Sequence, residues 1–82
     1  MTVFTDKEIE DLNAIKARAE KDATRLEAIE RRLNNRSEKL FGSDDDTADK
    51  LDDVGGECGH LAGQLRYRVA SEILPLILAA KI

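Results

Sequence analysis

The first half of the chain carries an apolar residue at every seventh position, namely Leu12, Ala19, Leu26, Leu33 and Leu40. Ile15 and Ile29 stand three residues further on in two of the repeats, which is the spacing of a coiled-coil seam. Asp22 interrupts this second row, so the adjacent Ala23 is expected to take the buried place there. The pattern predicts one long helix over about residues 5–41.

Capping signals mark both ends of this helix. Thr5 and Glu8 have the spacing of a capping box, in which each side chain accepts a hydrogen bond from the other residue's backbone amide. Gly42 predicts a left-handed turn at the end of the helix, and Ser43 is expected to cap the next one. Because the connection is short, the two helices should be antiparallel neighbours.

The second half has a different apolar spacing. Its row steps by three or four residues through Leu51, Val54, Cys58, Ala62, Leu65, Val69, Ile73 and Leu76. Eleven residues per three turns is close to the period of a straight helix, which predicts a second helix over about residues 44–81. Gly55–Gly56 is a possible break, but the apolar phase continues through it. Pro75 removes one amide, so a kink is expected near residues 74–75.

Three glycines recur every fourth residue within the second helix. Gly55, Gly59 and Gly63 therefore lie along one stripe, with Leu65 close by. Each helical glycine costs about 1 kcal/mol relative to alanine, and close approach of another backbone is the usual compensation. We therefore expect these four residues to form a helix-packing interface.

Folding the chain at Gly42 predicts which residues face each other across the hairpin. Residues whose numbers sum to about 84 should be neighbours, because the two helices run in opposite directions from the turn. Gly59 should then lie near Arg25 and Gly63 near Lys21.

Length and composition limit the chain to one small domain over residues 1–82. Residues 1–43 carry nine acidic and nine basic side chains, whereas residues 44–82 carry eight acidic and four basic ones. An acidic balance argues against direct nucleic-acid binding. The single cysteine excludes an internal disulfide, and neither a secretory signal nor a long apolar segment is evident, so a cytoplasmic protein without membrane association is expected.

An acidic cluster opens the second helix, with Asp44, Asp45, Asp46, Asp49, Asp52 and Asp53. Its spacing does not match an EF-hand loop, because Asp49 stands where that loop needs glycine. The favoured interpretation is compensation of the helix dipole and pairing with the basic end of the first helix. The alternative is an acidic surface that mimics DNA.

Candidate chemistry is sparse. Cys58 and His60 are two residues apart, which on a helix points them away from each other. Zinc needs four ligands, and the chain has no other cysteine or histidine. No triad, phosphate loop or metal constellation is recognisable, so we expect no catalytic residues, no cofactor and no metal.

The end of the second helix offers the best candidates for partner binding. Arg66, Tyr67 and Arg68 form the only basic–aromatic cluster, a composition common in binding hot spots. The arginines could instead pair with Glu10, Asp11 or Glu20 of the first helix. The segment from Ile73 to Ile82, which includes Leu76 and Ile77, is apolar on nearly all faces and therefore needs more than one neighbour.

These observations predict an all-α fold, an antiparallel two-helix hairpin that dimerises into a four-helix bundle. The expected function is a non-enzymatic protein–protein interaction module, such as a small adaptor, chaperone-like factor or inhibitor, with an unidentified protein partner. The alternative is an acidic DNA-mimicking inhibitor or the dimerisation module of a nucleic-acid regulator.

Overall fold

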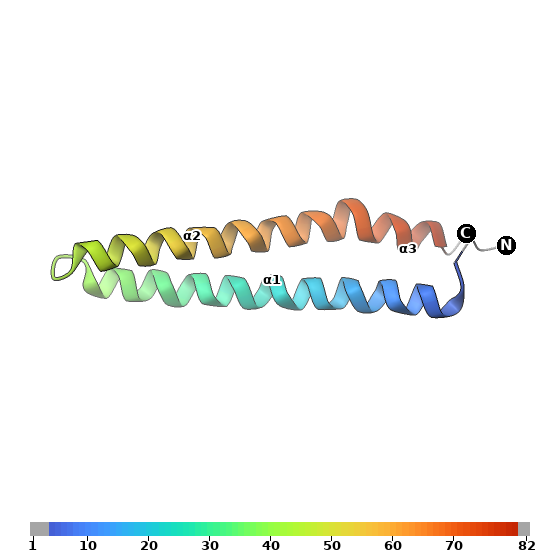
Figure 1. The fold of residues 1–82 in the computed structure, drawn as a ribbon, viewed down its shortest axis with the longest axis horizontal. Helices are drawn as coiled ribbons and strands as arrows, with labels where there is room; N and C mark the ends of the chain where they lie inside the picture. The colour runs from blue at the N-terminus through green and yellow to red at the C-terminus, as the bar shows by residue number, and fades with distance from the viewer. Residues whose placement is uncertain (1–3, 81–82) are drawn as a thin grey trace.

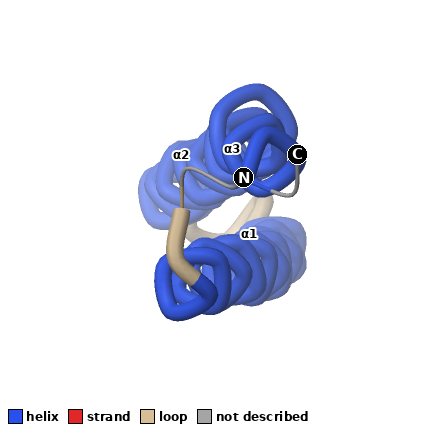
Figure 2. The backbone as a smooth tube through the Cα atoms, turned by 90° about the vertical axis from the view of Figure 1, so that its right-hand side faces the viewer, coloured by secondary structure: helices blue, strands red, loops and turns tan. Residues whose placement is uncertain are grey.

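Two long antiparallel helices form a hairpin in the computed structural model, which describes residues 4–80 (Figure 1). Helix α1 spans Asp6–Leu40 and helix α2 spans Asp45–Arg68. A π-helical turn, η1 (Val69–Ile73), and a short helix, α3 (Leu74–Ala80), continue α2 without a break. The Cα trace extends 64 × 17 × 11 Å, so the molecule is a rod, with the start of α1 and the end of α3 at the same tip, as the view along the rod shows (Figure 2). The predicted helical hairpin is confirmed.

The start of α1 has the predicted capping box. The Thr5 amide donates to the Glu8 carboxylate at 2.9 Å, and the Glu8 amide donates to the Thr5 hydroxyl at 3.2 Å. These bonds satisfy amides that the helix itself leaves without acceptors.

The turn between the helices agrees with prediction at one residue and differs at another. Gly42 has φ +92°, the left-handed conformation that favours glycine. Asp44, and not Ser43, caps α2, because its carboxylate accepts from the Thr47 amide at 3.2 Å. The Ser43 hydroxyl instead donates to the Leu40 carbonyl at 3.1 Å, which serves the end of α1.

A row of buried residues runs between the helices, spaced by seven or fourteen residues in α1 and α2 and by eight across the π-helical turn. We call it the seam; it comprises Ala23 and Ser37 of α1, Ala48, Gly55 and Ala62 of α2, Val69 of η1 and Ile77 of α3. Ala23 is fully buried, as predicted. The eleven-residue spacing predicted for the second helix is wrong, because Val54 is exposed and Gly55 takes its place in the seam.

The π-helical turn shifts the helix by one residue before Pro75. In it, the Leu74 amide donates to the Val69 carbonyl, five residues back instead of four. A proline in a helix lacks an amide and its ring crowds a carbonyl one turn earlier, and a local widening relieves both effects. As a result, Ile77 and not Leu76 continues the seam. The predicted kink near residues 74–75 is thus a wider turn just before them (Figure 1).

Two further predictions for the helix interface need correction. Ile15 and Ile29 lie outside the seam, with 53% and 39% of their surface exposed. The register also differs, since Gly59 lies beside Glu30 and not Arg25. Helical side chains lean toward the N-terminus of their own helix, so the side chain of Glu30 extends away from the turn and reaches a more distant residue of α2.

Candidate interaction surfaces

The two long sides of the hairpin differ in chemistry. On a helix, the residues one before and three after a seam residue lie on one side, and the residue four after lies on the other. The first side gathers the large apolar residues, and we call it the apolar face. It comprises Leu12, Ile15, Leu26, Ile29, Leu33 and Leu40 of α1, Leu51, Val54, Cys58, Leu61 and Leu65 of α2, Ile73 of η1 and Leu76 of α3.

The apolar face is only half covered by its own chain. Its inner rows, which contain Leu33 and Leu65, are half-buried, whereas Val54 and Leu61 of the outer row are about half exposed. Among residues 4–80, no large side chain is completely buried. Apart from Val69 and Ile77, the hairpin therefore buries small residues in the seam, and it leaves most of its large apolar side chains in partial contact with water, which costs free energy.

The opposite side, which we call the polar flank, holds the two helices together through polar groups. The Arg66 guanidinium pairs with the Glu27 carboxylate at 2.5 Å and donates to the Thr24 hydroxyl at 3.2 Å. Deeper in the interface, the buried Ser37 hydroxyl donates to the Ala48 carbonyl at 2.9 Å. Arg66 thus binds α1, as one of the two interpretations of the basic cluster expected, although Glu27 was not among the partners considered.

The ion pair across the polar flank shifts the pKa values of both Glu27 and Arg66. The hydrogen bond from Arg66 lowers the pKa of Glu27 below its ordinary value of 4.5, with the charges of Arg66 and Arg31 acting in the same direction. The same bond raises the pKa of Arg66. Since the pKa of Glu27 is lowered by folding, its stabilising effect is complete above the ordinary pKa and is lost as the pH falls through the lowered, folded-state pKa.

Acidification should therefore destabilise the hairpin less when Glu27 is replaced. We expect the melting temperature of Glu27→Gln to fall less than that of the wild type between neutral pH and about pH 3 at low salt. Glu10→Gln is the matched control, since Glu10 lies on the same helix and its side chain makes no hydrogen bond or ion pair within residues 4–80. Thermal melts followed by circular dichroism measure the difference. An equal fall in melting temperature on acidification for both variants would contradict a role for the Glu27–Arg66 pair.

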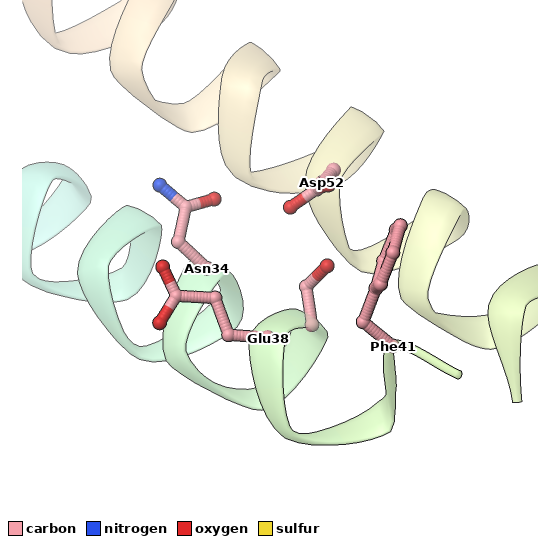
Figure 3. A pocket seen from close by; sticks show the side chains of 5 residues that line it. Asn34, Glu38, Phe41 and Asp52 are labelled. Atoms are coloured by element: carbon pink, nitrogen blue, oxygen red, sulfur yellow. The ribbon is translucent and has the colours of Figure 1, made fainter. Parts of the chain in front are cut away.

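An open cleft lies on the polar flank next to the turn. Figure 3 shows Asn34 and Glu38 of α1 and Asp52 of α2 around it, with the ring of Phe41 at the end nearest the turn. The residues that line it are largely exposed, apart from Ser37. No group of three or more His, Cys, Asp or Glu side chains arranged to hold a metal is found in the part of the chain that the structure describes.

The glycine stripe occupies three different environments. Gly55 is buried, and a side chain there would meet Leu33, Asn34 and the Glu30 carbonyl of α1. Gly59 is covered by the flexible Glu30 carboxylate, whereas Gly63 is exposed with open space around it. The reason is rotation: a four-residue step advances about 40° around the helix, so the stripe leaves the interface within two steps. Gly63 therefore does not pack against α1, and Leu65 lies on the apolar face.

The residues considered for partner binding are spread around the end of the rod. Tyr67 points outward with 70% of its surface exposed, while Arg68 and Leu76 lie in the outer row of the apolar face. Ile77 is 3% exposed within its own chain, so it belongs to the seam and is not available to a partner. The candidates therefore do not form one continuous site.

A separate apolar stripe lies on the outer surface near the C-terminal end. Its residues, which we call the outer stripe, are Tyr67, Ala70, Leu74 and Leu78, spaced by three, four and four. All four are exposed, and the π-helical turn between Tyr67 and Leu74 rotates Leu74 and Leu78 relative to Tyr67, so together they cover a broad strip of the outer surface. The sequence pattern missed this stripe because it treated the whole C-terminal segment as apolar all round. The π-helical turn determines which residues of α3 face α1. The sequence gives no clear sign of this turn beyond Pro75.

The remaining residues singled out in the sequence stay apart. Cys58 is half-buried on the apolar face and His60 is exposed on the outer surface, as their spacing predicts. The acidic residues at the start of α2 are exposed, and none forms an ion pair within residues 4–80. The Asp44 carboxylate is occupied as the helix cap, and its hydrogen bonds from Thr47 lower the pKa of Asp44.

Comparisons with known proteins leave the function open. Within the described residues, no helix combines the length and apolarity needed to cross a membrane. No protein family, curated protein or solved structure matches the chain.

Proposed function

We propose that this chain is a non-enzymatic protein–protein interaction module that binds a partner protein through the outer stripe. The observation that carries the proposal is the position of this stripe. Tyr67, Leu74 and Leu78 project from the outer surface, where α1 does not cover them. Aromatic and aliphatic side chains on one side of a helix are typical anchors for a groove or for a second helix.

The end of the rod suits such a contact. Exposed Tyr67 combines a large apolar ring with a hydroxyl that can hydrogen-bond at the rim of an interface. The Ser71 hydroxyl donates to the Tyr67 carbonyl at 2.7 Å, which satisfies part of the backbone next to the stripe. An adaptor, a chaperone-like factor and an inhibitor all act through a contact of this kind.

The test is a pull-down from a lysate of the organism that makes the protein, with three forms of the chain as baits. We expect wild-type chain to capture a protein that the double variant Tyr67→Asp, Leu78→Asp does not. Ala17→Asp is the matched control, because Ala17 is exposed on α1, away from the stripe. Capture by the wild type and the control alone supports the proposal. Equal capture by all three baits, or no specific capture, contradicts it.

The acidic start of α2 supports a second candidate. Asp46, Asp49 and Asp53 are exposed without ion pairs in the described part of the chain, so this end of the rod carries a concentrated negative charge. Such a surface could occupy the DNA-binding groove of a nucleic-acid protein. In that case, capture of the partner protein should weaken steeply as the salt concentration rises. It should be lost in the double variant Asp46→Asn, Asp53→Asn, whereas the double variant Tyr67→Asp, Leu78→Asp should bind normally.

A further inference from the structure

The outer row of α1 on the apolar face is complementary to itself when its order is reversed. Its members, spaced by seven, are Glu8, Ile15, Asp22, Ile29 and Arg36. Reversing the row about Asp22 places Ile15 on Ile29 and Glu8 on Arg36. Apolar residues then meet apolar ones, and an acid meets a base. A two-fold axis requires this kind of match, because it brings residue i of one chain to residue j of the other, and j to i.

We infer that the apolar face binds a second copy of this chain, in antiparallel orientation, with the two-fold axis at Asp22. The α1 helices of the two copies then lie against each other with their turns at opposite ends. This inference goes beyond the proposed function, because it concerns the apolar face and leaves the outer stripe exposed. Either one can fail while the other stands.

The second helix fits the same axis. The Arg66 guanidinium reaches Thr24, so Arg68 lies at about the level of Asp22. From Arg68, the outer row of the apolar face continues to Leu61 on one side and, because of the extra residue in η1, to Leu76 on the other. Reversal therefore places Leu61 on the Leu76 of the second copy. At the axis, two Asp22 and two Arg68 side chains of opposite charge come together.

The size of the face is adequate for a stable dimer. The Cα trace measures 64 by 17 Å across this side, or about 1,000 Å², whereas a standard interface buries about 800 Å² on each partner. Asp22, Arg36 and Arg68 form no ion pair within residues 4–80, so their charges are available across such an interface. Homodimer interfaces are more apolar than other interfaces, which also suits this face.

The mass in solution and one matched pair of variants test the dimer. Light scattering of the full chain at micromolar concentration should give about twice the chain mass of 9.1 kDa. Ile29→Asp places a charge in the interface and should weaken the dimer by about 100-fold or more. Tyr67→Asp changes a more exposed apolar residue outside the face and should leave the mass unchanged. A helical wild-type monomer, or equal masses for both variants, would overturn the inference.

A mixing experiment tests the orientation and does not depend on Ile29→Asp remaining folded. Arg36→Glu and Glu8→Arg each place like charges together in their own dimers. A mixed dimer of the two variants restores opposite charges at both ends of an antiparallel interface. Native mass spectrometry at low salt should show the mixed dimer above its statistical share, and the excess should disappear at high salt. Statistical mixing at low salt would overturn the antiparallel arrangement.

Discussion

Replacing Gly55 by leucine is expected to lower the free energy of unfolding by about 2 kcal/mol, despite the higher helix propensity of leucine. Gly55 is the glycine at which α2 approaches α1 most closely. A Cβ there would lie 3.5 Å from the Leu33 Cβ and 3.6 Å from the Glu30 carbonyl oxygen. The remaining leucine carbons would extend into α1 itself, so the helices would have to separate around the seam.

Two other substitutions show whether packing causes that loss. Gly63→Leu adds the same side chain where the structure has open space, and it should raise the free energy of unfolding by about 1 kcal/mol. Gly55→Ala should be tolerated, because its Cβ would crowd only the end of the Asn34 side chain, 2.9 Å away, which can rotate. Urea denaturation followed by circular dichroism, at one protein concentration, measures all three. Equal losses in the two leucine variants would contradict close packing at Gly55.

Local features of the fold are readable from the sequence because they depend on neighbouring residues only. The Thr5–Glu8 capping box, the left-handed Gly42 and the continuous helix through Gly55 each follow from the chemistry of a few adjacent positions. The Lys16–Glu20 ion pair, at 2.9 Å on one turn of α1, is local in the same way, because residues four apart on a helix are neighbours.

The choice of seam could not be made from hydrophobicity alone. Two rows flank the regular leucines of α1: one holds Ile15 and Ile29, and the other holds Ala23 and Ser37. Apolarity favours the isoleucines. The structure uses the smaller residues, because at the level of Gly55 and Ala62 the helix α2 comes too close for a branched side chain between the backbones, although Val69 and Ile77 fill the seam further along. The isoleucines are left for the apolar face, where we propose that a second chain covers them.

The surfaces proposed for binding could also be predicted only in part from the sequence. Arg66 and Tyr67 are adjacent in the chain, but Arg66 is held by Glu27 while Tyr67 points outward. Ile77 looked as available as Leu76, although only Leu76 is exposed. Both differences depend on the phase of the helix, and the π-helical turn changes that phase by one residue after Val69.

The extra residue in the π-helical turn leads to a prediction about the stability of chains that lack one residue. If η1 carries one residue more than the seven-residue spacing needs, deleting Ser71 should let the helix become regular while Ile73 and Ile77 keep their positions. Pro75→Ala serves as the common background, since a regular helix would press the proline ring against a carbonyl one turn earlier. We expect this deletion to change the free energy of unfolding by less than about 1 kcal/mol relative to Pro75→Ala.

Deleting Gln64 in the same background is the matched control and should have a much larger effect. Gln64 is exposed like Ser71, but it lies within regular helix, where no extra residue exists to be removed. The segment after it would rotate by about 100°, so Leu65 and Val69 would leave their places and Arg66 would turn inward. Two lost apolar contacts at about 1.5 kcal/mol each predict a loss of at least about 3 kcal/mol. Denaturation at equal protein concentration compares the two deletions. Similar losses would mean that the π-helical turn does not absorb a surplus residue.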